Sequence, residues 1–252
     1  EVLSPAHLLR AFREELHKSL TPQPPAVERP DYRLLGAIIA IEGQLYFVKG
    51  YGPEKICVRA VGVAELPSRF GEFRIVAFWN NRDAKEHVAI VKGDPFGQEE
   101  VPVRLHSECL TGDALGSLRC DCRDQLGGAL EKISALERGL LLYLRQEGRG
   151  IGLANKMRAY SLQDQGFDTV EANLHLGFKA DPRDYGTGAQ ILVDLGARRL
   201  RLMTNNPKKL AQLAQYGIRV ESRIPHVMPP NPHNRFYLET KRDRSGHWID
   251  FT

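Results

Sequence analysis

The second half of the chain alternates between helix-like and strand-like segments, and this alternation constrains the fold more than any other feature. Apolar spacing predicts helices over residues 126–136, 151–165, 188–195 and 207–216. Apolar runs between them predict strands over residues 140–144, 200–203 and 218–221. Strands that alternate with helices predict α/β layers with substantial parallel pairing. Ligands of such sheets bind where loops leave the carboxyl ends of the strands.

The first half of the chain has β patterns instead. Strands are predicted over residues 38–41, 45–48, 56–61, 72–78 and 87–92. Before them, helical apolar spacing after Ser4 predicts a short helix ending near Leu20, and prolines between 22 and 30 predict an extended linker. The tail after Ile224 also carries several prolines, so we expect it to be irregular and at the surface.

The expected fold class is therefore α/β. We expect a mixed layered sheet with flanking helices, preceded by an antiparallel β region and a short N-terminal helix. The chain is predicted to divide into an accessory part, residues 1–62, and a catalytic domain, residues 63–252.

Composition favours a globular protein without a membrane span. The chain has 252 residues, 42% of them hydrophobic, and a net charge of +4 without a polybasic block. No stretch approaches the roughly 20 apolar residues of a membrane helix, and the first residues do not have the charged-then-apolar pattern of a secretory leader. We expect a soluble cytoplasmic protein, and the mild basic excess suits a polyanionic small molecule as well as a nucleic acid.

Three cysteines lie within fourteen positions: Cys109, Cys120 and Cys122. Three thiolates can hold a zinc ion and leave its fourth position for water, which distinguishes a hydrolytic site from a structural one. Burial as ordinary small apolar side chains is the alternative, but Glu108 and Asp121 beside them make an apolar setting unfavourable. Clustered thiolates of this kind indicate a reducing compartment rather than disulfides.

The remaining cysteine, Cys57, lies in an apolar strand pattern. We expect it to be a core residue without a chemical role.

Longer motifs surround and follow these cysteines. They are RLHSECLTGD at 104–113, RCDC at 119–122, RQEGRGIGL at 145–153 and TNNPKK at 204–209. In this order they resemble the signature segments of GTP cyclohydrolase II, the enzyme that opens riboflavin biosynthesis. The resemblance covers roughly residues 66–251.

The resemblance implies a reaction and its cofactors. It implies a zinc-dependent hydrolase that opens the guanine imidazole ring of GTP and releases formate and pyrophosphate. The product would be 2,5-diamino-6-(5-phosphoribosylamino)pyrimidin-4(3H)-one. One catalytic Zn²⁺ per chain would be held by Cys109, Cys120 and Cys122, and its hydroxide would attack C8. Mg²⁺ would accompany the triphosphate, and the protein would be a cytoplasmic homodimer with no membrane or nucleic-acid partner.

Three catalytic residues are also implied by the resemblance. Arg183 matches an arginine proposed to attack the α-phosphorus, Asp181 matches its proton acceptor, and Tyr160 matches a tyrosine needed for the ring chemistry. A protonated guanidinium has no free lone pair, so we expect Arg183 to contact phosphate rather than to act as a nucleophile. As alternatives, Asp181 beside Pro182 could form a turn, and Tyr160 could anchor its helix.

A larger set matches the family's substrate contacts. These residues are Arg104, Leu105, His106, Ser107, Glu108, Gln125, Glu147, Gly148, Arg149, Thr169, Thr204 and Lys209. Their cations suit phosphate, the glycines let backbone amides approach closely, and Glu147 can accept hydrogen bonds from guanine N1 and N2. Two alternative interpretations stay open: His106 could be structural, and Lys209 could be a solvated surface charge.

The sequence departs from the family pattern at two places. Arg123 stands where relatives often carry glycine, which could alter the loop or add a phosphate contact. Residues 1–62 have no counterpart in the minimal enzyme, and could serve dimer packing, replace the dihydroxybutanone phosphate synthase domain of fused relatives, or bind a partner. Two other functions are weighed: a paralogue that stops at the formamidopyrimidine or serves another pathway, and a GTP-sensing or nucleic-acid-binding module with structural zinc.

Overall fold

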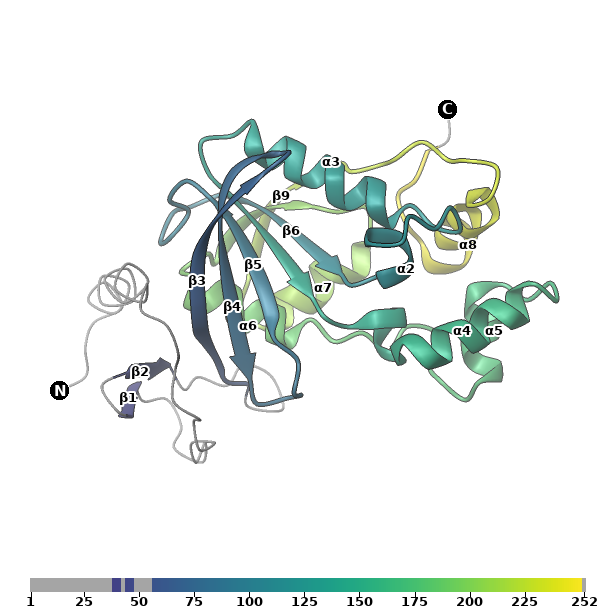
Figure 1. Ribbon diagram of the computed structural model, residues 1–252, viewed down its shortest axis with the longest axis horizontal. Coiled ribbons are helices and arrows are strands. Elements are labelled where there is room, and N and C mark those ends of the chain that lie inside the picture. Colours follow the sequence, from purple (N-terminus) through teal and green to yellow (C-terminus); the bar gives the residue numbers. More distant parts are fainter. Residues whose placement is uncertain (1–37, 42–43, 48–55, 251–252) are drawn as a thin grey trace.

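A seven-stranded mixed sheet forms the centre of the protein (Figure 1). The structure is a computed structural model that describes residues 38–41, 44–47 and 56–250. In chain order the strands are β3 (Val58–Ser68), β4 (Gly71–Asn80), β5 (His87–Lys92), β6 (Val101–Ser107), β7 (Gly139–Leu144), β8 (Arg199–Met203) and β9 (Arg219–Ile224). Their order across the sheet is β3-β4-β5-β7-β6-β8-β9. The predicted mixed α/β fold is confirmed.

The sheet changes from antiparallel to parallel pairing at β7. Strands β3, β4, β5 and β7 pair antiparallel, whereas β7, β6, β8 and β9 pair parallel. The predicted antiparallel β region is therefore one side of the main sheet. A separate two-stranded antiparallel sheet is formed by β1 (Ile38–Ile41) and β2 (Gln44–Phe47).

Part of the N-terminal prediction lies outside the described residues. This applies to the helix ending near Leu20, the proline-rich linker and the turn at residues 42–43. The division between residues 62 and 63 stays a prediction, and β3 runs across that position without interruption. Cys57 is buried directly before β3, as expected of a core residue.

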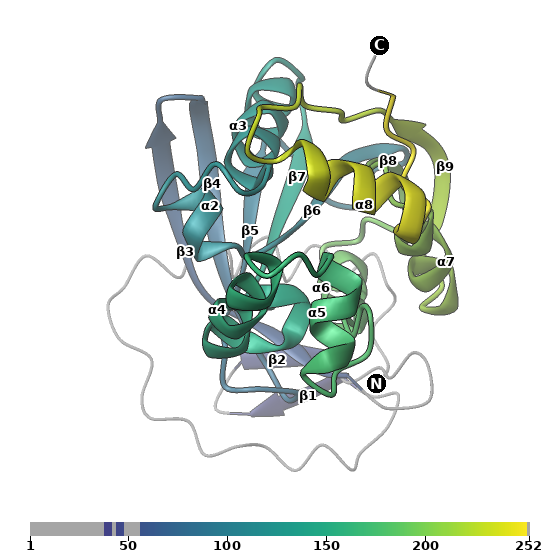
Figure 2. The same ribbon diagram turned by 90° about the vertical axis from the view of Figure 1, so that its right-hand side faces the viewer.

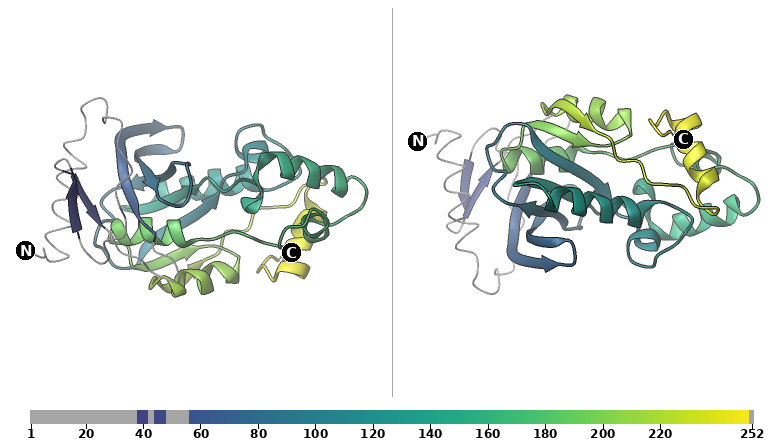
Figure 3. Two further views of the ribbon diagram at one scale, coloured as in Figure 1. Left: turned by 90° about the horizontal axis from the view of Figure 1, so that it is seen from below. Right: turned by 90° about the horizontal axis from the view of Figure 1, so that it is seen from above.

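Helices cover both faces of the sheet (Figure 3). One face packs under α3 (Cys122–Ser134), and the other packs against α6 (Gly186–Asp194) and α7 (Pro207–Gln215). Successive side chains of a strand point to opposite faces. Accordingly, Leu141 of β7 joins the cluster under α3 with Ile133, while Leu142 joins the larger cluster that contains Ile191 and Leu213.

A second group of helices gathers beyond the carboxyl ends of β6 and β7 (Figures 1 and 2). They are α2 (Leu110–Asp113), the 3-10 turn η1 (Glu147–Gly150), α4 (Gly152–Gln163), α5 (Thr169–His175) and α8 (Arg235–Ser245). Figure 2 shows α4, α5 and α8 together at this end of the molecule. None of the helices in the described part of the chain is long and apolar enough to cross a membrane.

The prediction of an irregular tail is wrong for residues 235–245, which form α8. Only Leu238 and Thr240 of this helix are buried. A helix with so few buried residues has little apolar periodicity in its sequence, and for this reason it was not predicted. Long-range contacts hold it instead, including the ion pair of 3.2 Å between Arg244 and Asp168, the residue that caps α5. Most helical stability in proteins comes from such tertiary packing rather than from local propensity.

Candidate functional site

A pocket opens where the parallel strands end. Ser107 closes β6, Glu147 follows β7 and Thr204 follows β8, and all three residues line this pocket. Parallel strands bring these three ends to one edge of the sheet, where the polar backbone of the following turns is left for a ligand. The pocket therefore lies where α/β sheets bind ligands.

Most of the predicted site residues meet in this pocket. They are Arg104, His106, Ser107, Glu108, Cys109, Cys120, Cys122, Gln125, Glu147, Gly148, Arg149, Tyr160, Thr169, Arg183, Thr204 and Lys209. Two predicted residues do not line it. The Leu105 side chain is buried in the core, and its carbonyl oxygen accepts a 2.7 Å hydrogen bond from Lys209 Nζ. Asp181 lies behind Arg183 as its hydrogen-bond partner.

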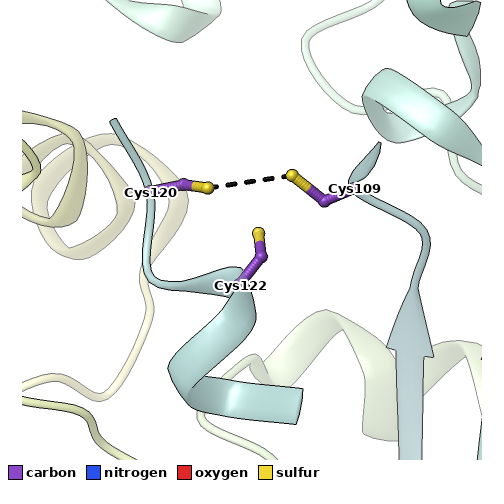
Figure 4. Close-up of side chains that lie close together, drawn as sticks. All are labelled: Cys109, Cys120 and Cys122. Atoms are coloured by element: carbon purple, nitrogen blue, oxygen red, sulfur yellow. Dashed lines mark hydrogen bonds between the residues drawn. The ribbon is translucent and has the colours of Figure 1, made fainter. Parts of the chain in front are cut away.

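The three cysteines converge on one point of the pocket wall (Figure 4). Cys109 follows β6, and Cys122 is the first residue of α3. All three Sγ atoms lie within 4.8 Å of one another, and those of Cys109 and Cys120 are 3.7 Å apart. Two thiolates about 2.3 Å from a tetrahedral zinc lie about 3.8 Å apart, so the spacing fits this ion.

Gly112 of α2 makes room for this cluster. A Cβ atom at this position would lie 2.8 Å from Cys120 Sγ and 3.1 Å from Cys109 Sγ. Within the described residues, no histidine, aspartate or glutamate donor joins the three sulfurs. The set therefore fits a metal ion with one position left open toward the pocket, as catalytic zinc sites have.

Asp113 holds the turn that carries Cys109. Its carboxylate accepts hydrogen bonds from the Cys109 backbone N–H at 3.0 Å, the Tyr143 hydroxyl at 2.8 Å and His106 Nε2 at 3.0 Å. The His106 ring is only 3% exposed and stacks on Tyr143, and burial lowers its pKa. His106 thus has a structural contact in addition to its place in the pocket wall. Tyr143 was not predicted as a site residue, because it lies in an ordinary apolar strand pattern.

A second network fixes Arg104 and Gln125. Arg104 donates to the Met203 carbonyl oxygen at 2.9 Å and to Gln125 Oε1. The amide of Gln125 donates in turn to Asp121 Oδ2 at 2.7 Å. Burial lowers the pKa of Arg104 to about 10, which leaves the guanidinium protonated at neutral pH.

Arg183 and Asp181 form a bidentate pair. Nε and Nη2 of Arg183 donate to the two carboxylate oxygens at 2.7 and 2.5 Å. Burial opposes the charge, but Tyr185 and Asp181 raise the pKa of Arg183 above its ordinary value. The guanidinium therefore stays a cation, in keeping with the expectation of a phosphate contact.

Tyr160 faces the cysteine turn from α4. Its hydroxyl lies 3.1 Å from Thr111 Oγ1, and the Arg119 guanidinium lies 5.1 Å from its ring centroid. Burial raises its pKa. The phenol thus carries its proton at neutral pH, within the pocket that the three cysteines also line.

Basic side chains outnumber acidic ones in the pocket lining. They are Arg104, Arg119, Arg149, Lys156, Arg183, Lys209 and Lys241, against the carboxylates of Glu108, Asp121 and Glu147. Burial, together with the charges of Arg104 and Arg183, lowers the pKa of Lys209 well below its ordinary value. Lys209 is buried, so the surface-charge alternative is wrong for it. A cleft with this excess of positive charge attracts a polyanion.

Other residues of the pocket had no signal in the sequence. Lys156 comes from α4, and Tyr237 and Lys241 come from α8, which the sequence analysis took for irregular chain. Arg123 does not line the pocket. It lies against Gly116, where a Cβ atom would be 2.7 Å from Arg123 Nη1, so the residue shapes the loop rather than the ligand site.

Comparisons with known proteins show the family of the chain. The family model described as GTP cyclohydrolase II matches residues 58–225. Among curated relatives, riboflavin biosynthesis protein RibBA from Synechocystis is 59% identical over 74% of this chain and 34% of its own length. The proteins of that name from Chlorobium phaeovibrioides and Bacillus subtilis are 57% and 58% identical, over 77% and 74% of this chain and 47% of each relative. The chain thus spans at most about half the length of these relatives.

A solved structure also shows a distant likeness. A two-domain 3,4-dihydroxy-2-butanone 4-phosphate synthase from A. baumannii aligns at a TM-score of 0.39 and 22% identity, over 68% of this chain and 40% of the other. This likeness is too weak to carry an argument.

Proposed function

Because the chain belongs to the GTP cyclohydrolase II family, we propose that it opens the imidazole ring of GTP by hydrolysis. The proposed products are formate, pyrophosphate and 2,5-diamino-6-(5-phosphoribosylamino)pyrimidin-4(3H)-one. The observation that supports this most is one pocket that combines three converging thiols with an excess of cations. Such a pocket suits a hydrolytic metal and a triphosphate at once.

Cys109, Cys120 and Cys122 would hold the zinc ion. When bound, a zinc ion in an open three-ligand site supplies a water molecule of lowered pKa and a Lewis acid. β6 leads into Cys109 and α3 begins at Cys122, so a strand and a helix would hold two of the three sulfur ligands in place.

The cations of the pocket would bind the triphosphate. Arg183 is oriented by Asp181, Arg104 is oriented by Gln125, and Arg149 lies in η1 beside Gly148. Gly148 has a φ of 62°, which glycine adopts without strain, and its backbone N–H donates to Glu147 Oε1 at 2.8 Å. Mg²⁺ would accompany the phosphates, because it binds phosphate oxygens with few protein ligands.

The guanine ring would be read by Glu147, Gln125, Thr169 and Thr204. Glu147 accepts hydrogen bonds from Lys156 Nζ at 2.8 Å and from the Leu110 backbone N–H at 2.6 Å. Oε1 also accepts from the Gly148 backbone N–H, whereas Oε2 has one lone pair left and can accept from a guanine N1–H or N2–H. Tyr160 would hold or move a proton at its hydroxyl oxygen during ring opening.

The biological setting belongs to the same proposal. We infer a role in riboflavin biosynthesis, which the printed names of the relatives support. A cytoplasmic location, assembly as a homodimer, and the accessory role of residues 1–62 stay predictions.

The deciding experiment incubates the purified chain with GTP, Zn²⁺ and Mg²⁺ and measures formate and pyrophosphate together. We expect both products in equal amounts, and a product mass that lacks C8. A product that retains the formyl group would instead support the paralogue that stops early. The C120S variant is the control: a folded protein without formate release supports a catalytic metal, whereas unfolding supports a structural one.

A further inference from the structure

Lys156 brings a buried ammonium group against one of the metal-binding sulfurs. The residue lies on α4 and is only 9% exposed. Its Nζ atom donates to Cys109 Sγ at 3.1 Å and to Glu147 Oε1 at 2.8 Å. A charged donor on a thiolate forms a strong hydrogen bond in such a setting.

Glu147 orients the ammonium group of Lys156 by accepting a hydrogen bond from it. Its carboxylate is fixed in turn by the Leu110 backbone N–H at 2.6 Å and by the Gly148 backbone N–H at 2.8 Å. Lys156, Glu147 and the turn after Cys109 therefore form one connected unit, and the direction of the N–H bond toward sulfur is set by the fold.

Gly148 lets α4 come close enough for this contact. A Cβ atom on Gly148 would lie 3.2 Å from Lys156 Cβ and 3.0 Å from Ile151 Cγ1, and the residue has a φ of 62°. Four positions after Lys156, Tyr160 lies on the same face of the helix and also lines the pocket. The same helix face thus carries both the sulfur contact and the predicted catalytic phenol.

We propose that Lys156 is a positioning residue of the metal centre, whose ammonium group hydrogen-bonds the Cys109 thiolate and so strengthens metal binding. The inference rests on the proposed function, because it requires that the three cysteines hold a metal ion. The hydrogen bond fixes the direction of the Cys109 sulfur, so that this ligand is already oriented when the metal binds. Partners of this kind change metal affinity by about 10–100-fold when they are removed.

The test measures metal binding rather than turnover. Apo-protein is titrated with Zn²⁺ in competition with a chromophoric chelator, and Co²⁺-loaded protein is examined for its sulfur-to-cobalt charge-transfer band. For K156M we expect zinc affinity to fall about 10–100-fold. The band should move to longer wavelength, because the sulfur lone pairs rise in energy without the hydrogen bond.

Two variants control for charge and for the donor. R158M removes an exposed cation from the same helix without touching the cluster, and we expect wild-type affinity and band position. K156R retains a cationic N–H donor and should recover most of both properties. A K156R protein that behaves like K156M while remaining folded would contradict the hydrogen-bond role.

The unpaired Glu147 carboxylate could prevent K156M from folding. The E147Q/K156M double variant removes both charges and should show the same loss of affinity and the same band shift, with a normal circular dichroism spectrum. A folded variant lacking Lys156 that keeps wild-type zinc affinity and band position would overturn the inference alone. A wild-type protein that binds neither Zn²⁺ nor Co²⁺ would overturn the proposed function as well.

Discussion

Lys241 of α8 donates a 2.8 Å hydrogen bond to Asp121, the residue between Cys120 and Cys122. Asp121 is only 2% exposed, so its charge depends on this partner. The C-terminal segment lies beyond the family match at residues 58–225, yet it contacts the turn that carries Cys120 and Cys122.

Breaking this pair should destabilise the protein. In K241M the Asp121 carboxylate stays buried without its cation, and we expect a loss of about 3 kcal/mol in the free energy of unfolding. Urea denaturation at saturating zinc measures it. The D121N/K241M double variant should recover part of the loss, and R242M, at an exposed position of the same helix, should change stability by less than about 0.5 kcal/mol. Equal stability of K241M and wild type would contradict the role of the pair.

Gly112 should not tolerate a side chain. In G112A the added methyl group would meet Cys120 Sγ at 2.8 Å, so the sulfurs must separate. We expect at least a tenfold loss of zinc affinity, measured by chelator competition. The matched control is G127A on α3, where a Cβ atom meets Phe70 at an ordinary 3.5 Å, and helix propensity should add about 0.5–1 kcal/mol of stability. Unchanged zinc affinity in G112A would argue against a three-sulfur site.

Tyr160 should matter for the reaction and not for the metal. Y160F removes a phenol proton from the pocket, and we expect formate release to fall by about 100-fold or more. Zinc content should stay at the wild-type level. T111V removes only the hydrogen-bond partner of the phenol, 3.1 Å away, and should lower the rate by less than tenfold. A Y160F enzyme with the wild-type rate would assign the residue to the support of its helix.

His226 should make the protein sensitive to acid. Its ring is 0% exposed, its Nε2–H donates to the Gln125 carbonyl oxygen at 2.7 Å, and burial together with the Arg104 charge lowers its pKa to about 3. The unfolded chain binds the proton near pH 6.5, so the stability contribution is present above that pH and is lost as the pH falls toward 3.

Between pH 7 and pH 5 this linkage amounts to about 2 kcal/mol of unfolding free energy. H226Q keeps an N–H donor but does not titrate, so its stability should change less over the same interval. Denaturant melts at both pH values, with wild type and variant side by side, measure the difference. An identical pH dependence of the two proteins would show that His226 is not the responsible group.

Asp194 should have the opposite effect at alkaline pH. Burial raises its pKa to about 8, although Gln190 donates to its carboxylate at 2.9 Å. The folded state therefore retains the proton that the unfolded chain releases near pH 4, and the stability contribution is lost as the pH rises toward 8. The Asp194 side chain keeps some contact with water, so we expect the loss of stability to be about 1–2 kcal/mol.

D194N should abolish that decline. We expect wild type to lose stability between pH 5 and pH 9 while the variant loses less, with thermal melts in matched buffers as the measurement. A decline of equal size in D194N would place the titrating group elsewhere.

Local patterns predicted most of the elements. The runs at 140–144 and 200–203 became β7 and β8, and the helix that begins at Pro207 became α7, because apolar periodicity and capping signals are written in neighbouring residues. The cluster of three cysteines was also predictable from the sequence, since thiols beside charged residues are unusual in a core.

Residues that act across the fold were not predictable in this way. α8 has few apolar residues, and its place over the pocket depends on partners more than sixty positions away, such as Asp121 and Asp168. Lys156 is an ordinary helix residue until α4 is folded against the turn after Cys109. No local signal reports these contacts, because the partners are distant in the chain.

The amino-acid sequence by itself determined the alternation of strands and helices, the group of three cysteines and the family, because each is encoded in short-range spacing and in residue type. Only the tertiary structure decided what surrounds those sulfurs: the ammonium of Lys156, the Asp113 carboxylate and the ion pair between Lys241 and Asp121. These groups meet because the parallel strands end at one edge of the sheet and the C-terminal helix packs back over it. Because these charged groups are buried close together, they interact strongly although they are distant in the sequence.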